Sequence, residues 1–586
     1  MLKLLKKLSK KEIIYALVCI ILIAFHVWLE LRIPDYMSGI TQLVQTEGSK
    51  MSEILEQGTL MIGCAFLSLI CNIIVGYFAA RVASGFSSTL RASIFKKVAN
   101  MGIAEVKKFS TSSLITRTTN DVTQIEMLVG MGLQVMVKAP IMAISAIFKI
   151  LNKGLEWSLL VAFCVAILLF VVSILMIIVL PRFEKVQKLI DKINGVTREN
   201  LSGIRVIRAF NAEGYQTNKF KKVNDDLTNM QLFNQRCFAI MNPVMNLIMH
   251  GLTLGIYIIG AILINRVGMS EKIILFSNMV VFSSYGMHVI MSFMMLTMIF
   301  MMAPRAQISA NRINEVLDEK CSIYDGDFDG KTRQVGVVEF KNVSFKYPEA
   351  DEYVLKDISF KINKGEVIAF IGSTGSGKST LINLIPRFYD VVEGEVLVDG
   401  VNVKEYKLEA LYNKIGYVPQ KAVLFTGTVN SNVSYGNNGK GQISDRKVKE
   451  AVKVAQAKDF VEKMEENYDA YIARAGTNVS GGQKQRLAIA RAIAREPEIY
   501  IFDDSFSALD YKTDATLRKE LKEYTKDATS IIVAQRIGTI INADKIVVLD
   551  EGKCVGIGTH KELLKNCDVY KEIALSQLSK EELENA

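Results

Sequence analysis

A glycine-rich segment in the second half of the chain carries the residue types that bind phosphate. Residues 372–379 read Gly-Ser-Thr-Gly-Ser-Gly-Lys-Ser and fit the pattern G-x-x-x-x-G-K-[ST]. A strand-like apolar run, 366–371, precedes this segment and a helical run follows it. A glycine turn at such a junction lets backbone N–H groups converge on phosphate oxygens. Lys378 is then expected to reach the β- and γ-phosphates, and Ser379 to offer its hydroxyl to Mg²⁺.

Two adjacent acids follow another apolar run, 499–502. Asp503 closes this run and suits a Mg²⁺ ligand, whereas Asp504 stands where a hydrolytic base would position or deprotonate the attacking water. In nucleotide-hydrolysing sites of this class the base is normally Glu, and the side chain of Asp is one methylene shorter. A general base must lie within about 2.6–3.2 Å of its proton, and a misplacement of about 1 Å can cost on the order of 10²-fold. A small backbone shift that restores the reach of Asp504 is the alternative interpretation.

A later position supports slow hydrolysis independently of Asp504. The segment Val533-Ala-Gln-Arg536 carries Gln535 where His is usual. Gln can hydrogen-bond a phosphate, but it cannot carry a protonic charge as His can. Only four His occur, and none is placed to sense a γ-phosphate. These substitutions predict a site that binds nucleotide well and hydrolyses it poorly.

Short β-type runs alternate with helical patterns from residue 337 onward. This alternation predicts an α/β domain with an open, largely parallel sheet. The runs expected to form strands are 337–340, 367–371, 415–418, 499–502, 531–534 and 546–549.

The first half of the chain contains apolar stretches long enough to cross a membrane. A hydrocarbon core roughly 30 Å thick is crossed by about 20 helical residues. Six stretches are candidates: 12–29, 60–80, 127–151, 157–181, 237–264 and 273–304. Lysines precede the first stretch and acids dominate the loop after it, so the N-terminus is expected to be cytoplasmic. No small-residue cleavage site follows the first stretch, which argues against a signal peptide.

Size, charge and cysteine content narrow the function further. A chain of 586 residues is too long for one core, so at least two domains are expected. The net charge of +10 is better explained by cytoplasmic lysines facing anionic lipid than by nucleic-acid binding. The eight Cys show no paired metal spacing and are expected to be reduced.

Two long polar connectors, 81–126 and 182–236, join the second span to the third and the fourth to the fifth. Their apolar spacing is helical, and loops of this length without structure are uncommon. Helices there would extend on the order of tens of ångströms into the cytoplasm. A membrane domain with such hairpins is built to transmit motion to a soluble domain. Residues 305–318 are expected to form a helical linker.

The order and spacing of several further motifs resemble those of exporters of the ABC superfamily. Val479-Ser-Gly-Gly-Gln-Lys-Gln-Arg486 matches the family's signature motif, which is more diagnostic than the phosphate loop. Residues 116–121 and 199–210 resemble the two coupling regions of exporters. The chain is similar to a half-transporter, in which the membrane domain is fused ahead of the nucleotide-binding domain.

The resemblance implies roles for particular residues. Tyr347 would stack on adenine, Gln420 would contact Mg²⁺ and face the membrane domain, and Asp510 would lie in a loop that crosses a dimer interface. The metal ligands would be Ser379, Gln420 and Asp503. The residues expected to bind ATP in this chain are Tyr347, Gly372, Ser373, Thr374, Gly375, Ser376, Gly377, Lys378, Ser379, Thr380 and Gln420. The signature residues expected to contact ATP across the interface are Ser480, Gly481, Gly482 and Gln483.

The resemblance also implies an organisation and a partner. Residues 1–304 would form a six-helix α-helical membrane domain, 305–334 a linker, and 335–586 an α/β P-loop ATPase domain of the ABC type. Nucleotide domains of this family pair head to tail, so each ATP lies between the phosphate loop of one and the signature of the other. The degenerate residues Asp504 and Gln535 therefore predict a heterodimer with a second, non-identical half-transporter in a plasma membrane, with ATP and Mg²⁺ as cofactors. Two alternatives stay open: a nucleotide-gated regulatory or channel-like subunit, and a homodimeric exporter with two slow sites.

The membrane half offers weaker signals. Lys138 lies inside the third span, where an ionisable residue is a functional hypothesis by default; snorkelling, lining a cavity and contacting substrate are all compatible with it. His250 and His288 are expected to pack or to form hydrogen bonds. The Met-rich sixth span suits a multidrug-type or lipid-like cavity and equally suits ordinary packing. The transported molecule is left open by these residues.

Overall fold

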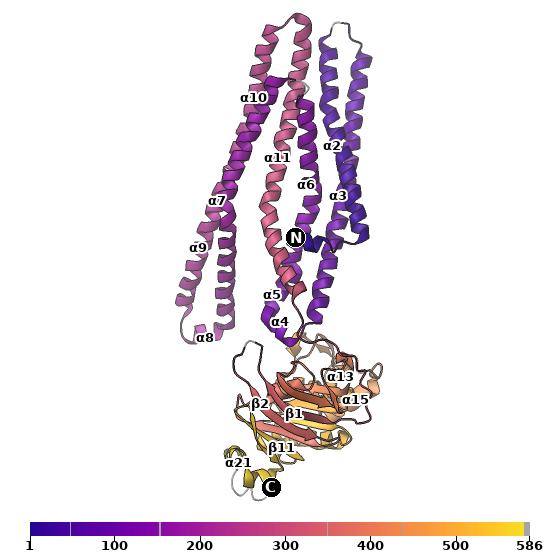
Figure 1. The fold of residues 1–586 in the computed structure, drawn as a ribbon, viewed down its shortest axis with the longest axis vertical. Coiled ribbons are helices and arrows are strands. Elements are labelled where there is room, and N and C mark those ends of the chain that lie inside the picture. The colour runs from indigo at the N-terminus through magenta and orange to yellow at the C-terminus, as the bar shows by residue number, and fades with distance from the viewer. Residues whose placement is uncertain (47, 152–153, 349, 437–438, 579–586) are drawn as a thin grey trace. The chain divides into compact units, whose positions relative to one another are not determined.

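The computed structural model describes residues 1–46, 48–151, 154–348, 350–436 and 439–578 (Figure 1). The chain divides into two compact units. The first unit contains Met1–Ala99 and Thr111–Glu319, and the second contains Asn100–Ser110 and the chain from Lys320 onward.

The first unit is built of helices, most of them long. They are α1 (Leu2–Leu5), α2 (Lys10–Gln45), α3 (Met51–Ala99), α5 (Thr111–Thr116), the π-helix η1 (Arg117–Asp121), α6 (Val122–Leu151), α7 (Leu155–Ser202), α8 (Ile204–Ala209), α9 (Glu213–Ala239), α10 (Met241–Arg266) and α11 (Met269–Asp318). Among the residues that the structure describes, six helical stretches are long and apolar enough to cross a membrane, and each contains one of the predicted spans. The prediction of six spans is therefore confirmed. Helices suit the hydrocarbon core of a membrane because they satisfy their backbone hydrogen bonds within one segment.

A capping box sets the start of α2. The Ser9 hydroxyl accepts a hydrogen bond from the Glu12 N–H at 3.3 Å, and the Ser9 N–H donates to Oε2 of Glu12 at 2.6 Å. The other Glu12 oxygen lies 2.5 Å from the point where a Cβ on Gly85 would stand. Gly85 of α3 therefore leaves the room in which the capping carboxylate of α2 is buried.

Polar side chains within the spans pair with one another. The Lys138 ammonium of α6 lies 2.9 Å from Oε2 of Glu30 and 3.0 Å from Nε2 of His26, both on α2. Nδ1 of His26 lies 2.8 Å from the Ser68 hydroxyl of α3. Because isolated charge is costly at membrane depth, these contacts give Lys138 a structural role in joining α2, α3 and α6.

A second polar contact joins α2 to α6 and α11. Asp35 accepts from the Lys149 ammonium at 2.5 Å and from the Tyr285 hydroxyl at 2.6 Å. The other two span histidines are less enclosed than His26: His250 is exposed and His288 is half-buried.

The second connector is helical, as its apolar spacing predicts. In Figure 1, α7 and α9 run side by side and α8 joins them at the end of the hairpin. The Arg182 guanidinium lies 4.3 Å from the centre of the Phe233 ring, and Lys219 pairs with Glu199 at 2.7 Å. The helix expected over 305–318 is the end of α11, which continues without a break from the last span to Asp318.

The second unit contains two main sheets. Their strands are β1 (Val338–Phe345), β2 (Leu355–Ile362), β3 (Val367–Gly372), β4 (Glu393–Val398), β5 (Val401–Asn402), β6 (Ile415–Val418), β9 (Ile499–Asp503), β10 (Thr529–Val533), β11 (Lys545–Asp550) and β12 (Lys553–Gly558). The six-stranded sheet has the order β12-β11-β3-β10-β9-β6, with β12 antiparallel to β11 and all other neighbours parallel. The four-stranded sheet, β2-β1-β4-β5, is antiparallel. A two-stranded pair joins β7 (Gly427–Thr428) and β8 (Tyr471–Ile472).

The α/β prediction is confirmed, with one difference. The run predicted at 337–340 belongs to β1 of the antiparallel sheet and not to the parallel one. Its neighbour β2 alternates buried and exposed residues, a weaker signal than the continuous apolar runs of strands that are buried on both faces. The second sheet was therefore missed.

Helices cover the sheets. They are α4 (Ile103–Phe109), α12 (Lys378–Leu384), α13 (Leu408–Lys414), α14 (Val429–Val433), α15 (Asp445–Val454), α16 (Lys458–Val461), α17 (Gly481–Ala494), α18 (Tyr511–Tyr524), α19 (Ile537–Ile540), α20 (His560–Asn566) and α21 (Asp568–Leu575), with 3-10 turns at Asn467–Asp469 and Arg474–Gly476.

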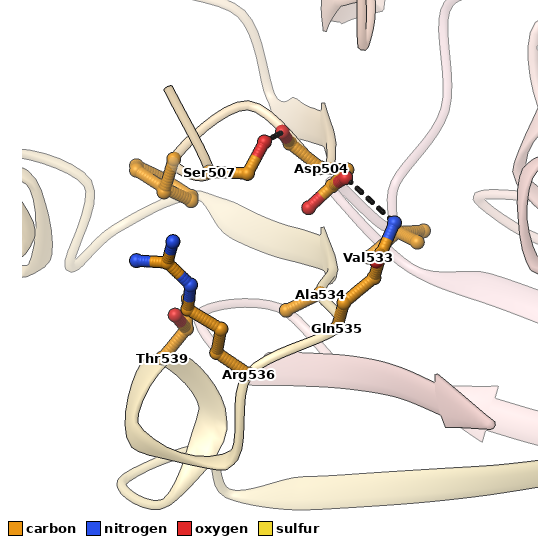
Figure 2. Close-up of a pocket in the computed structure, with 8 residues that line it drawn as sticks. Asp504, Ser507, Val533, Ala534, Gln535, Arg536 and Thr539 are labelled. Carbon is orange, nitrogen blue, oxygen red and sulfur yellow. Dashed lines mark hydrogen bonds between the residues drawn. The ribbon is translucent and has the colours of Figure 1, made fainter. Parts of the chain in front are cut away.

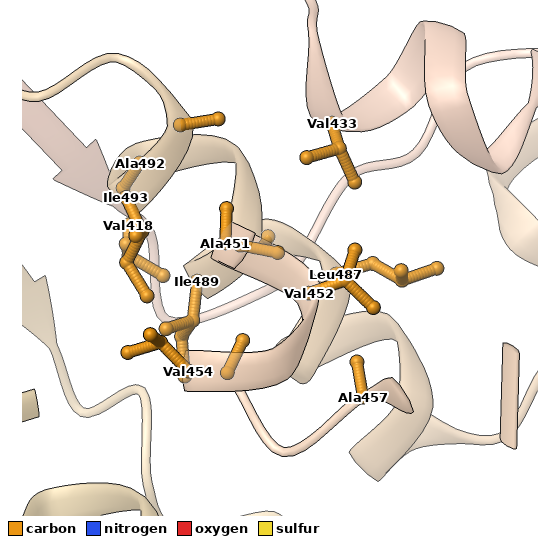
Figure 3. Close-up of a cluster of buried hydrophobic side chains, with 14 of the residues drawn as sticks. Val418, Val433, Ala451, Val452, Val454, Ala457, Leu487, Ile489, Ala492 and Ile493 are labelled. Carbon is orange, nitrogen blue, oxygen red and sulfur yellow. The ribbon is translucent and has the colours of Figure 1, made fainter. Parts of the chain in front are cut away.

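The central strand β9 is buried on both faces. Ile499 and Ile501 lie in the core shared with the antiparallel sheet and α12, whereas Tyr500 and Phe502 lie in the core formed with α14, α15 and α17. Figure 3 shows part of the second core, where side chains of α15 and α17 interdigitate. This double burial holds the end of β9, and the acids there, in a fixed position.

Helix α4, from the middle of the first connector, is part of the second unit. Ala104 of α4 lies against the core of the two sheets. Glu105 accepts from the Ser322 N–H at 2.8 Å, and the Lys107 ammonium donates to the Tyr389 hydroxyl at 3.2 Å.

Removing one member of the Lys138–Glu30 pair should destabilise the membrane part. Lys138→Met leaves Glu30 without its cation, and Glu30→Gln leaves Lys138 without its anion. Each single variant is expected to lower the free energy of unfolding by about 1–3 kcal/mol, and the double variant by less than the sum. Thermal unfolding in detergent would measure these changes. Strict additivity of the two substitutions would contradict a direct pair.

Candidate functional site

Four loops that carry predicted residues meet at one edge of the six-stranded sheet. Strands β3, β10, β9 and β6 are adjacent and parallel, so their carboxyl ends lie together. The phosphate loop, residues 372–379, follows β3; Gln535 follows β10, Asp504 follows β9, and Gln420 follows β6. Val533 of β10 pairs with Asp503 of β9, so the residues that follow these two strands lie at the same edge of the sheet.

The phosphate loop turns sharply before α12. Gly377 caps this helix with a φ of 95°, and a Cβ there would stand 2.7 Å from Leu355. A left-handed backbone and close packing both favour glycine at this position. The Lys378 ammonium donates to the carbonyls of Gly372 at 2.9 Å and Ser373 at 2.7 Å, so it lies within the concave side of the loop.

The Lys378 ammonium lies where the phosphate groups of a bound nucleotide would stand. Burial lowers the pKa of its ammonium, and the carboxylates of Asp504 and Asp503 oppose this shift. Phosphate oxygens would supply both the negative charge and the acceptors that the lysine needs there.

Ser379 and Asp503 form a pair of oxygen donors suited to Mg²⁺. The Ser379 hydroxyl donates to Oδ1 of Asp503 at 2.8 Å. Asp503 is buried, and its burial raises the pKa of its carboxyl, while the Ser379 hydrogen bond lowers it. A buried carboxylate beside a hydroxyl is a site at which a hard divalent cation would compensate the desolvated charge. The residues present therefore fit the metal.

Asp504 receives two amide donors. Its Oδ2 accepts from Nε2 of Gln535 at 2.9 Å and from Nε2 of Gln420 at 3.2 Å. Figure 2 shows the Gln535 side chain pointing to the carboxylate from the neighbouring strand end, and the Ser507 hydroxyl donating to the Asp504 carbonyl. The backbone of Asp504 is left-handed, with a φ of 45°; Asp tolerates this conformation better than most residues do.

Tyr347 lies beside the phosphate loop helix. Its hydroxyl is 2.9 Å from that of Thr380, and its ring meets the Tyr389 ring edge-on with centroids 5.3 Å apart. The Lys107 ammonium of α4 lies 5.8 Å from the centre of the Tyr347 ring. A half-buried aromatic ring next to the phosphate loop is placed to stack on a base.

The signature residues start a different helix. Ser480 caps α17, with its hydroxyl accepting from the Gln483 N–H at 3.3 Å. A Cβ on Gly482 would lie 3.2 Å from the Ala508 carbonyl, so the signature packs against the loop that ends at Asp510. Asp510 caps α18 by accepting from the Thr513 N–H at 3.0 Å. In the described part of the chain, no hydrogen bond links the signature to the phosphate loop.

Comparison with known proteins identifies the chain. Residues 355–507 match the family described as ABC transporter, and residues 13–303 match the family described as ABC transporter transmembrane region. A Mycobacterium tuberculosis protein named as an uncharacterized ABC transporter ATP-binding protein is 41% identical over 89% of this chain and 89% of its own length. The chain belongs to the ABC transporter family.

Other relatives agree with the assignment. A Bacillus subtilis ABC transporter ATP-binding protein is 36% identical, over 89% of this chain and 90% of its own length. An ATP-dependent lipid A-core flippase of Haemophilus influenzae is 31% identical, over 89% and 87% of the two chains. The structure of a bacterial Atm1-family ABC exporter with ATP bound has the same fold, with a TM-score of 0.82, 22% identity and coverage of 97% and 99%.

The chain is thus an ABC half-transporter. One membrane region precedes one ATPase region. It is a multi-pass protein of the plasma membrane, with the ATPase region in the cytoplasm.

The structure of this ABC half-transporter also reveals residues that the motifs did not predict. The Tyr417 hydroxyl donates to Oδ1 of Asn383 at 3.1 Å, next to the phosphate loop helix. The Ser505 hydroxyl donates to the Val418 carbonyl at 3.1 Å and ties the end of β9 to that of β6. Gln485 of α17 donates to the Pro419 carbonyl at 3.3 Å, which links the signature helix to the Gln420 loop. These contacts join segments far apart in sequence and have no local pattern.

Asp503→Asn should separate metal binding from stability. A carboxyl whose pKa is raised by folding contributes stability only at low pH, and this contribution is lost as the pH rises. At pH 7 the neutral amide should therefore raise the melting temperature of the nucleotide-free protein. It should also abolish the additional stabilisation of the folded protein that Mg²⁺ gives when ATP is bound. This stabilisation is about 2.7 kcal/mol when the ligand concentration is 100 times Kd. Thermal unfolding with ATP, with and without Mg²⁺, measures both effects.

The matched control is Asp399→Asn in the same unit. Asp399 is also buried, but it pairs with the Lys414 ammonium at 2.8 Å. Its substitution should lower the melting temperature and preserve the Mg²⁺ effect. A full Mg²⁺ effect in Asp503→Asn would contradict the proposed ligand.

Proposed function

We propose that this chain is one subunit of an unequal ABC exporter pair, whose own phosphate loop holds ATP and turns it over slowly. In this proposal, residues 1–304 form the membrane domain, 305–334 the linker and 335–586 the nucleotide-binding domain. The partner is a second, non-identical half-transporter.

The observation that carries the proposal is the pair of amides on Asp504. Gln535 and Gln420 both donate to Oδ2 of Asp504. A base must accept a proton from the attacking water, and Oδ2, which already receives two N–H donors, could do so only after releasing one of them. Oδ1 alone is then available as the base. The short side chain of Asp compounds this effect, because its reach is one methylene less than that of Glu. Both features favour nucleotide binding over hydrolysis.

Gln535 is a second, separate reason to expect slow hydrolysis. Its amide is neutral at every physiological pH, so it can donate to a γ-phosphate but cannot supply the protonic charge of a His. At the same time it remains a phosphate ligand, so retention of ATP is expected.

The other predicted residues supply every group that ATP binding needs in this proposal. The loop 372–377 would offer its N–H groups to the phosphates, Lys378 would pair with the β- and γ-phosphates, and Tyr347 would stack on adenine. Ser379, Asp503 and Gln420 would hold Mg²⁺. Bound Mg²⁺ would neutralise charge on the β- and γ-oxygens.

The intact signature supports a role in the partner's site. Ser480 and Gln483 form a complete capping box that fixes the start of α17, and the N-terminus of a helix attracts an anion. Gly482 packs against the loop that carries Asp510. We propose that Ser480, Gly481, Gly482 and Gln483 contact ATP held by the partner, with Asp510 at the interface between the two chains.

Exposed apolar residues at the end of the second connector support pairing with another chain. Leu201, Val206 and Phe210 are 71%, 60% and 78% exposed. They lie on or next to α8, at the end of the hairpin of α7 and α9. This end of the hairpin extends beyond the membrane spans, so lipid does not explain the exposed apolar residues. We propose that this end docks on the nucleotide-binding domain of the partner.

Restoring both residues should accelerate this site. The double variant Asp504→Glu/Gln535→His is expected to raise hydrolysis at this chain's phosphate loop on the order of 10- to 100-fold. The rate is measured as single-turnover hydrolysis in the reconstituted pair, with the partner's phosphate-loop lysine substituted.

Two further variants control this experiment. Adding Ser379→Ala should abolish the gain, and the melting temperature should report any strain from Glu in the left-handed backbone. An unchanged rate in the restored variant would refute the assigned roles. Rapid hydrolysis coupled to transport by the isolated chain would indicate a homodimer, and passive nucleotide-gated flux would indicate a channel-like subunit.

A further inference from the structure

The side chain of Gln577 brackets the loop that carries Gln535. Its Oε1 accepts from the Ile537 N–H at 2.8 Å, and its Nε2 donates to the Gln535 carbonyl at 2.8 Å. One amide thus bonds the backbone on both sides of Arg536, as a neighbouring strand would do. These bonds fix the course of the loop from residue 535 to residue 537.

Gln577 is itself held by the C-terminal helix. It lies two residues after the end of α21, and its N–H donates to the Ala574 carbonyl at 3.1 Å. Ala574 and Tyr570 of α21 are fully buried in one core with Ala534 and Ile537. The helix and the loop therefore share a rigid base, whereas the Gln577 side chain is exposed and contributes little to that core.

The bracket acts on the reactive side of the same loop. The carbonyl that Gln577 holds belongs to Gln535, whose side chain donates to Oδ2 of Asp504 at 2.9 Å (Figure 2). Fixing the backbone of Gln535 limits where its amide can point. Without the bracket, Gln535 would be free to leave Asp504 and the position expected for the γ-phosphate.

We propose that Gln577 is a positioning residue for nucleotide turnover, acting through Gln535 on Asp504. The C-terminal segment is then part of the machinery of this chain's phosphate loop, although it contributes no group that touches nucleotide. The inference rests on the proposed role of Gln535, but not on whether the site is slow or fast.

The test is a double-mutant cycle between Gln577 and Gln535 in the full-length transporter in lipid nanodiscs. Gln577→Ala should raise the single-turnover rate of ATP hydrolysis about three- to tenfold, because a Gln535 amide that is no longer held in place releases Oδ2 of Asp504. This is the change produced by the loss of about one net hydrogen bond. The Kd for ATP should change less than about twofold. In a Gln535→Ala background the same substitution should have no further effect on the rate, because its route to Asp504 is already cut.

Two variants make the test specific. Gln577→Glu keeps the acceptor for Ile537 but sets a carboxylate against the Gln535 carbonyl, and it should behave like Gln577→Ala. Ser576→Ala is the matched control, since the exposed Ser576 hydroxyl bonds only within its own segment, to the Ile573 carbonyl at 2.7 Å; its rate should equal that of the wild type. Amide exchange over residues 533–537 should increase in the Gln577 variants alone.

Two outcomes would overturn the inference. One is an equal change of rate produced by Gln577→Ala with and without the Gln535 side chain. The other is a wild-type rate in Gln577→Ala together with increased amide exchange of the loop. If instead the site hydrolyses ATP rapidly but the cycle is non-additive, the slow-site proposal fails and the role of Gln577 stands.

Discussion

The parallel pairing of β3, β10, β9 and β6 is the constraint on which the site depends. Parallel strands end at the same edge, so four segments separated by up to 163 residues along the chain, from the phosphate loop at Gly372 to Gln535, come together there. Each strand is buried by cores on both faces, which leaves its end little freedom to move. The site is rigid because the sheet beneath it is rigid.

Asp504 is the point at which these segments meet. It receives one amide from the loop after β6 and one from the loop after β10, while its own N–H is bonded to the Val533 carbonyl. A displacement of any of the three segments would change the hydrogen bonds of this carboxylate. The bond from Gln577 adds the C-terminal helix to the same network, and the bond between Gln485 and Pro419 adds the signature helix.

The membrane part follows different rules. Its helices satisfy their own backbones, and apolar packing together with a few polar side chains holds them against one another. Lys138 with Glu30 and His26, and Asp35 with Lys149 and Tyr285, hold α2 against its neighbours. Helix α4, although it comes from the first connector, belongs to the second unit and packs with its sheets.

Local patterns in the sequence determined much of this protein. The apolar stretches revealed six spans, and the glycine loop and apolar runs revealed an α/β ATPase. Asp504 and Gln535 predicted slow hydrolysis. Each of these signals lies within a short segment. Only the tertiary structure showed that Gln420 and Gln535 share one oxygen of Asp504, that Lys138 is paired with Glu30, and that Gln577 holds the Gln535 loop. Such contacts join residues distant in the chain. The order of the strands and the packing of the helices bring them together, and local residue patterns do not encode that order.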